Sequence, residues 1–129
     1  YNKKKYLEKI EKYDVIVFST RPNFNHIENI NSFGWVSGRH DNIINIECKK
    51  KASDNIKDDY VIVGSFAFRN KFFFQNCITS LIQKKQKINK EYYMDLVIKE
   101  ALEKRYKVYN YVVDNYISWG TPSELNDNI

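Results

Sequence analysis

The sequence has few of the residues that small metal-binding or disulfide-linked domains depend on. Of its 129 residues only two are cysteine, two are histidine, four are glycine and two are proline. Cys48 and Cys77 form no CxxC pair and have no histidine at metal-ligand spacing, so the sequence indicates neither a zinc site nor a disulfide framework. We expect both cysteines to be reduced packing residues. His26 and His40 lie in separate polar segments, and we expect them at the surface.

Two common catalytic patterns are also missing. A phosphate-binding loop has the pattern GxGxxG or GxxxxGK, and the glycines at positions 34, 38, 64 and 120 form neither. The sequence contains no GxSxG pattern, which would present a serine nucleophile on a sharp turn. The chain therefore contains neither a glycine-rich loop for a nucleoside triphosphate nor the pattern expected for acyl transfer.

Long hydrophobic runs are absent as well. No apolar run approaches the roughly 20 residues that a membrane helix needs, and the first 14 residues, YNKKKYLEKIEKYD, contain no apolar stretch typical of a secretion signal. Hydrophobic residues nevertheless make up 43% of the chain, enough to bury a core. We expect a single soluble globular unit located in the cytoplasm. Because the chain begins with Tyr1 in mid-helix, we also expect it to be a piece of a longer protein.

Positive charge is in excess, with a formal net charge of +5. The surplus lysines are scattered over runs at 3–5, 49–51 and 84–87, which favours a solvated basic surface over a nucleic-acid interface. The aromatic residues, 16% of the chain, fall mainly in predicted core runs such as 72–74. We therefore expect no nucleic-acid partner.

The pattern of apolar residues predicts an α/β protein. Helical spacing predicts helices at 3–12, 71–85 and 91–105, and short apolar or alternating runs predict strands at 14–20, 33–38, 43–50, 59–70 and 107–113. The segments 21–32 and 52–59 are polar and are predicted loops. In the predicted hairpin of 33–38 and 43–50, we expect Ile44, Ile46 and Cys48 to share one face of the strand, with the polar residues between them on the other face. A threonine, a proline and a glutamate within 121–124 indicate the capped start of another helix.

Three stretches, taken in order, resemble the C-terminal half of the sugar-phosphate nucleotidyltransferases. ECKKKASDN runs into VIVGSFAFRN, which is similar to the family's "EKK-x-I-S-D" followed by a "V-G-x-Y-x-F" strand. INKEYYMDLVIKEALEKRYKV is similar to "V-N-G-E-F-Y-V" opening a helix before a "G-x-K-I/V" strand, and NYISWGTPSEL is similar to "Y-x-x-W-G-T-P-E-D-L". The resemblance covers about residues 10–129.

The resemblance implies a fold, a reaction and partners. The fold would be the C-terminal half of a Rossmann-like, GT-A-like mixed sheet flanked by helices, with residues 1–129 forming the acceptor half and the nucleotide-binding half lying outside this chain. Family members join a sugar 1-phosphate to a nucleotide, release pyrophosphate and use Mg²⁺. The longer protein would then be an enzyme making an activated sugar for surface polysaccharide, and this chain alone would be inactive. A sheet without its first strands exposes an edge, so self-association is also expected.

Carried over position by position, the family's motifs assign five binding residues. Lys49 matches the lysine that contacts the sugar phosphate, and Gly34 matches the glycine whose backbone lies along the sugar. Val63 and Gly64 match the strand under the sugar ring, and Glu91 matches the acid that hydrogen-bonds sugar hydroxyls. Each position also has a simpler interpretation. Lys49 could be a solvated lysine and Gly34 a turn glycine. Val63 and Gly64 could form a plain β-bulge, and Glu91 could be an acid favoured by the helix dipole.

Two positions depart from the family's pattern. Cys48 stands where many members have glutamate before the motif lysine, and Glu47, one place earlier on a strand, should point to the opposite face. Ser118 stands where relatives have an aspartate that holds Mg²⁺, and Asp114, four residues earlier, is the substitute metal ligand we expect. Asp95 is interpreted as structural. These departures leave open a second interpretation, a non-catalytic interaction or regulatory domain that keeps the fold.

Overall fold

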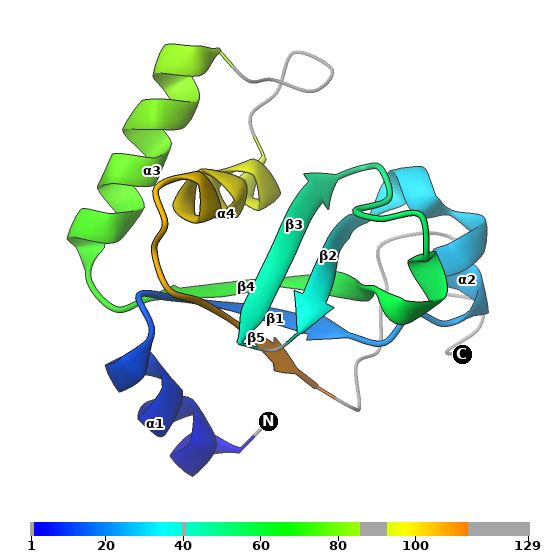
Figure 1. Cartoon of the computed structure of the whole chain (residues 1–129), viewed down its shortest axis with the longest axis horizontal. Coiled ribbons are helices and arrows are strands. Elements are labelled where there is room, and N and C mark those ends of the chain that lie inside the picture. The colour runs from blue at the N-terminus through cyan, green and yellow to red at the C-terminus, as the bar shows by residue number, and fades with distance from the viewer. Residues whose placement is uncertain (1, 40, 86–92, 114–129) are drawn as a thin grey trace.

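The protein is described by a computed structural model in which residues 2–39, 41–85 and 93–113 are placed. Within them a five-stranded mixed sheet has the order β3-β2-β4-β1-β5, and helices α3 and α4 lie on one side of it with α1 on the other (Figure 1). The strands are β1 (Val15–Thr20), β2 (Gly34–Arg39), β3 (Asn42–Cys48), β4 (Tyr60–Phe68) and β5 (Val108–Val112). The helices are α1 (Lys3–Lys12), α2 (Phe24–Glu28), α3 (Lys71–Lys84) and α4 (Met94–Glu103), with 3-10 turns η1 (Ile30–Ser32) and η2 (Ile56–Asp58). The predicted α/β class is confirmed.

Strand β1 lies inside the sheet, as its apolar sequence predicts. It pairs antiparallel with β4 and parallel with β5, and Val15, Ile16 and Val17 are completely buried. Because successive side chains of a strand point to opposite faces, complete burial of all three requires cover on both sides of the sheet. The two faces therefore have separate cores.

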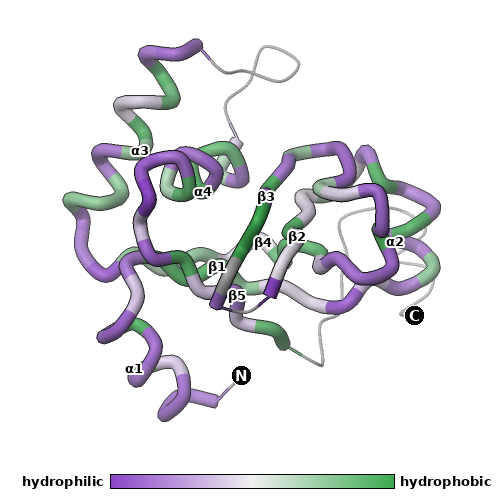
Figure 2. Tube along the Cα trace, in the orientation of Figure 1, coloured by the Kyte–Doolittle hydropathy of each residue, from purple (hydrophilic) through white to green (hydrophobic). Residues whose placement is uncertain are grey.

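The larger core lies under α3 and α4. It joins Val15 and Val17 to β2, β3 and β4 through residues that include Val36, Ile46 and Ile62, and to Cys77, Leu81, Leu96, Val97, Ile98 and Ala101 of the two helices. The smaller core contains Ile16, Tyr109 and Tyr111, packed against Tyr6 and Ile10 of α1. Figure 2 shows β3 as hydrophobic, β2 as mostly neutral and α1 as mostly hydrophilic, in keeping with a surface helix that packs one narrow stripe against the sheet.

The segment 21–32 is not a plain loop, and the prediction for His26 was wrong. Asn23 caps α2: its side chain accepts a hydrogen bond from the His26 amide, and its own amide donates to His26 Nδ1 at 3.0 Å. This reciprocal cap turns the imidazole inward, where it packs edge-on against Phe33 and is only 3% exposed. A polar sequence context thus hid a buried histidine. His40 lies outside the described residues.

The hairpin of β2 and β3 has the expected strands but an irregular register. Ser37 pairs with Asn45 and Gly38 with Ile43, so Ile44 is an extra residue on β3. Such a bulge interrupts the alternation of side chains, and Ile44 is 76% exposed while Ile46 is buried. The prediction that Ile44 shares the buried face of Ile46 and Cys48 was therefore wrong.

Both predicted amphipathic helices are present. The Asn70 side chain caps α3 through the amides of Phe72 and Phe73, and α4 has buried apolar residues along one side. On α3, Cys77 and Leu81 are buried while Ile82 is 52% exposed. Among the described residues, every helix is too short or too polar to cross a membrane. The predicted helix start at 121–124 lies outside them.

Cys48 and Cys77 are buried free thiols, as predicted. Burial, with a further contribution from Asp95, raises the pKa of Cys48 to about 12, and burial raises the pKa of Cys77 to about 11.

We expect neither thiol to react with Ellman's reagent in the native protein near pH 8, because the thiolate is the reactive form and both thiols stay protonated there. In guanidinium chloride both cysteines should react. The absorbance of the released thiolate measures the number of reactive groups, and rapid reaction of one thiol in the native state would contradict this expectation.

Candidate functional site

Four of the five predicted binding residues lie within the described part of the chain: Gly34 begins β2, Lys49 follows β3, and Val63 and Gly64 lie on β4. Gly34, the first residue of β2, pairs with Cys48, the last of β3. Lys49 follows directly, and its amide donates to the Phe33 carbonyl at 2.9 Å. Helix α4 packs against β3, which brings its first turn over this pair of strand ends.

Gly34 is a glycine because Asp95 occupies the space beside it. A Cβ added at Gly34 would lie 2.3 Å from Asp95 Oδ2 and 3.0 Å from Ile62 Cδ1. The Gly34 backbone does not lie in the positive-φ region, where Gly38 and Gly64 are found, so backbone conformation does not require the glycine. Contact with a sugar at this residue remains a prediction.

Asp95 is the carboxyl that our sequence interpretation passed over as structural. It lies in the first turn of α4, is half-buried, and accepts a hydrogen bond from the Cys48 thiol. Burial raises the pKa of Asp95, and the bond from Cys48 partly opposes this shift. One sequence signal could have located Asp95. It is an acidic residue on the sheet-facing side of a predicted helix, and that helix starts near the ends of the strands.

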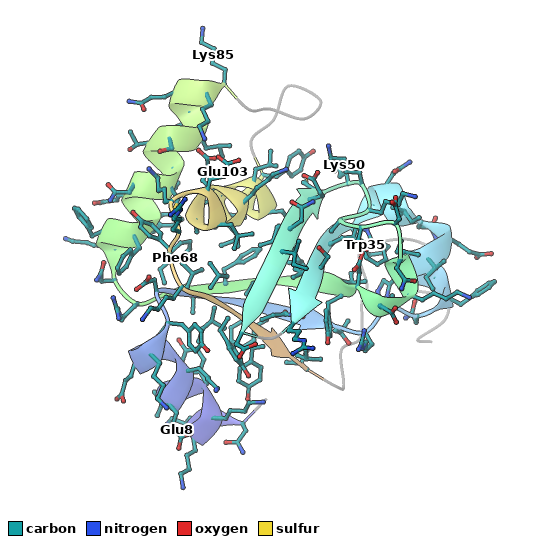
Figure 3. The ribbon with its side chains drawn as sticks, in the orientation of Figure 1. Glu8, Trp35, Lys50, Phe68, Lys85 and Glu103 are labelled. Atoms are coloured by element: carbon teal, nitrogen blue, oxygen red, sulfur yellow. The ribbon has the colours of Figure 1, made fainter. Side chains whose placement is uncertain are left out.

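Lys49 differs from the other two lysines of the KKK run. The Lys50 ammonium is 3.3 Å from Glu47, and that of Lys51 is 4.0 Å from Asp54, both on well-exposed side chains; Figure 3 marks Lys50 at the end of β3. Lys49 is half-buried, has a left-handed backbone with a φ of 60°, and holds its ammonium 4.7 Å from the centroid of the Tyr93 ring. A cation over an aromatic face is held in place without losing its charge.

Glu47 is engaged away from the Cys48–Asp95 pair. Its Oε1 is 2.5 Å from Lys99 Nζ on α4, and its Oε2 contacts Lys50. Burial would raise the pKa of Glu47, but the hydrogen bonds and charges of Lys99 and Lys50 outweigh it and lower the pKa. The glutamate of this motif therefore anchors α4 to β3.

Val63 and Gly64 lie on a bulge of β4. Val17 pairs with Phe66 and Ser19 with Ile62, so three residues of β4 stand opposite one residue of β1. Gly64 has a φ of 95°, and apart from Gly64 itself and its two chain neighbours no atom of the described residues lies within 4 Å of a Cβ built on it. It lines an open pocket of about 640 Å³ together with Phe74 of α3 and Met94 of α4. Neither Gly34 nor Asp95 is among the described residues that line it.

The remaining predicted ligands, Glu91 and Asp114, lie outside the described residues, as does Ser118. Among residues 2–39, 41–85 and 93–113, no group of three His, Cys, Asp or Glu side chains is arranged to hold a metal ion. The Mg²⁺ implied by the family resemblance therefore stays a prediction.

The arrangement of these elements has a counterpart among solved structures. The chain matches a nucleoside-diphosphate-sugar pyrophosphorylase from Vibrio cholerae RC9 with a TM-score of 0.69 and 14% sequence identity, over 93% of this chain and 48% of that one. The chain has a pyrophosphorylase-like fold. It spans about half the length of that enzyme, in agreement with a resemblance to one half of a nucleotidyltransferase. No protein-family model matches the chain, and no curated protein matches its sequence.

Replacing Gly34 by alanine should destabilise the protein by about 1–3 kcal/mol, because the new methyl group overlaps the Asp95 carboxyl. In an Asp95→Ala background the same change should cost less, with a coupling of about 0.5–3 kcal/mol. Urea unfolding of the four proteins in this cycle measures the coupling.

Gly64→Ala is the matched control. It should cost about 1–2 kcal/mol because of its left-handed backbone, and this cost should be the same with or without Asp95. Equal costs of Gly34→Ala in both backgrounds would show that Asp95 does not require the glycine.

Proposed function

We propose that this chain is the acceptor half of a sugar-1-phosphate nucleotidyltransferase, which forms a nucleotide-activated sugar for surface polysaccharide and releases pyrophosphate. The main support is the coincidence of two independent features. The pyrophosphorylase-like fold extends over 93% of the chain, and Lys49, assigned to the sugar phosphate by its motif, is the lysine of its run that is half-buried beside the start of α4.

The chemistry suits a site that lacks a nucleophilic side chain. An oxygen of the sugar phosphate attacks the α-phosphate of a nucleoside triphosphate in line, so one P–O bond forms while the bond to pyrophosphate breaks. Such transfers depend on positioning and charge stabilisation rather than on a covalent enzyme intermediate. In this proposal the Lys49 ammonium binds the sugar phosphate as a compact positive charge, and the open backbone at Gly64 borders the sugar. Other parts of the longer protein supply the triphosphate site, so this chain alone is inactive.

A non-catalytic domain with the same fold is the second candidate, and Cys48 is the observation that favours it. This thiol, protonated at neutral pH, stands where the family's motif has an acid. Calorimetric titration of the full-length protein with sugar 1-phosphates separates the candidates, because an interaction domain should give no saturable heat.

The test of the proposal is a pyrophosphate-release assay of the full-length protein with Mg²⁺, over all nucleoside triphosphates and a panel of sugar 1-phosphates. With the active pair, Lys49→Met should lower kcat/KM by roughly 10- to 150-fold, the equivalent of losing a charge-assisted hydrogen bond of about 1.5–3 kcal/mol. Lys51→Met, the same change at an exposed lysine of the same run, should have little effect. Equal effects of the two substitutions would overturn the role of Lys49.

We also expect the isolated chain to self-associate. Among the described strands β5 pairs only with β1, so its other side is a sheet edge, and exposed edges favour pairing with another strand. Sedimentation equilibrium at rising concentration measures this association. A clean monomer at high concentration would contradict it.

A further inference from the structure

Two adjoining cavities lie where the start of β3 closes over β5. These strands are at opposite ends of the sheet order, yet they contact each other (Figure 1), and Ile43 and Val108 line the same cavity. That cavity, of about 740 Å³, also borders the ends of α1 and α4. A smaller cavity of about 280 Å³ lies along α1, and Tyr13 and Asp41 line both.

These cavities are separate from the candidate acceptor site. β3 has seven residues, so its start is roughly 20 Å from its end, which Lys49 follows. None of the described residues that line the pocket at Gly64 lines either of the two cavities. A ligand bound here would therefore occupy a second site.

The charged lining of the two cavities is mainly positive. Among the described residues it contains a single aspartate, Asp41, and four lysines: Lys5, Lys9, Lys12 and Lys107. None of these four lysines forms an ion pair with a carboxylate in the part of the chain that the structure describes. An anionic ligand would therefore meet a net positive field.

Lys9 is half-buried, whereas the other three lysines are exposed. Its ammonium lies 4.7 Å from the centroid of the Tyr109 ring and 6.0 Å from that of Tyr13, and the Lys5 ammonium lies 5.0 Å from that of Tyr111. An aromatic face attracts an ammonium group without accepting all of its N–H bonds. Because partial burial removes hydration from the Lys9 charge, an anion bound there would recover part of that cost.

The spacing of Lys5 and Lys9 favours a phosphate over a carboxylate. Residues four apart on a helix are neighbours on its surface, and both lysines line the smaller cavity. A phosphate monoester carries close to two negative charges at neutral pH and has three acceptor oxygens. It can therefore accept hydrogen bonds from two ammonium groups at once, whereas a carboxylate brings a single charge.

The larger cavity adds apolar and aromatic surface beside these charges. The Tyr106 ring is fixed by edge-on contact with Phe73 at 4.9 Å, and its hydroxyl accepts a hydrogen bond from the Asn76 side chain at 3.2 Å. The Tyr13 ring packs 5.0 Å from that of Tyr109. Rings held in this way can pack against an aromatic ligand without losing further freedom. The apolar lining of the cavity consists of Ile43, Leu102, Val108 and the rings of Tyr13 and Tyr106.

We propose that the two cavities form a binding site for an aromatic phosphate ester, with the phosphate on Lys5 and Lys9 and the ring in the larger cavity beside Tyr13. Tyr13 lines both cavities, so one ligand can extend from one into the other. The site lies at the opposite end of β3 from Lys49, and it does not depend on the proposed nucleotidyltransferase activity.

Calorimetric titration of the full-length protein with phenyl phosphate tests this site. Methyl phosphate, which has the same charge and no ring, should bind about 10-fold more weakly, because it forms no aromatic or hydrophobic contact in the larger cavity. Lys9→Gln should lower the affinity for phenyl phosphate by about 10- to 150-fold, the equivalent of losing a hydrogen bond between charged groups. Lys4→Gln is the matched control, since Lys4 is an exposed residue of α1 that lines neither cavity. It should lower the affinity by less than about threefold, because salt screens its distant charge.

Lys49→Met separates this site from the acceptor site. It should leave the binding of phenyl phosphate unchanged. If Lys49→Met abolishes that binding and Lys9→Gln does not, the anion binds at the acceptor site, so this inference fails while the proposed function stands. Equal effects of Lys9→Gln and Lys4→Gln would indicate a general basic surface and would also overturn the inference, as would the absence of phenyl phosphate binding to the unmodified protein.

Lys5→Gln covers the case in which Lys9→Gln does not fold, because Lys5 is exposed and lines the same smaller cavity. This change should weaken phenyl phosphate binding by about 10-fold. Lys9→Arg keeps the positive charge and should retain most of the affinity. Unchanged binding in the Lys5→Gln variant would contradict the placement of the phosphate.

Discussion

The complete burial of β1 is the constraint on which the rest of the structure depends. Val15 and Val17 face the core under α3 and α4, and Ile16 faces the core under α1, so helices must cover both sides of the sheet. Asp14, just before the strand, ties three strand ends together: one oxygen lies 2.7 Å from Arg69 after β4, and the other accepts the Lys107 amide before β5 at 2.8 Å. These contacts hold the ends of β4 and β5 beside β1, and the bulge at Gly64 lies within the pairing of β1 with β4.

The candidate site depends on where α4 lies, and charged contacts at two places fix that helix. Lys99 joins it to Glu47 on β3. Lys84 of α3 contacts Glu100 at 3.0 Å and Glu103 at 2.6 Å, and Figure 3 marks Glu103 on the α3 side of α4. Glu100 is only 1% exposed, and burial raises its pKa while Lys84 opposes the shift. Lys84 itself is about half exposed, so these contacts join α4 to α3 at the surface end of a buried glutamate.

Much of the fold was predictable from the sequence, and the failures have identifiable causes. Among the described residues, apolar runs and helical spacing located all five strands and three of the four α-helices, because burial imposes those periods directly. The burial of His26 was missed because it depends on a reciprocal cap with Asn23, and the exposure of Ile44 because one extra residue on β3 reverses the alternation. The proximity of Asp95 to Gly34 joins residues 61 positions apart in the sequence, and no local pattern encodes such a contact.

The sequence by itself determined which segments are strands and helices, that both cysteines are buried thiols, and that the order of motifs matches half of a nucleotidyltransferase. The first two properties follow from composition and from the period of apolar residues along the chain, whereas the third is a resemblance of motifs to a known family. Only the tertiary structure decided which lysine of the KKK run lies over Tyr93, which acid of the motif anchors α4, and which carboxyl lies beside Gly34. Each of these depends on the packing of α4 against the end of β3, and such packing is set by contacts between distant segments of the chain.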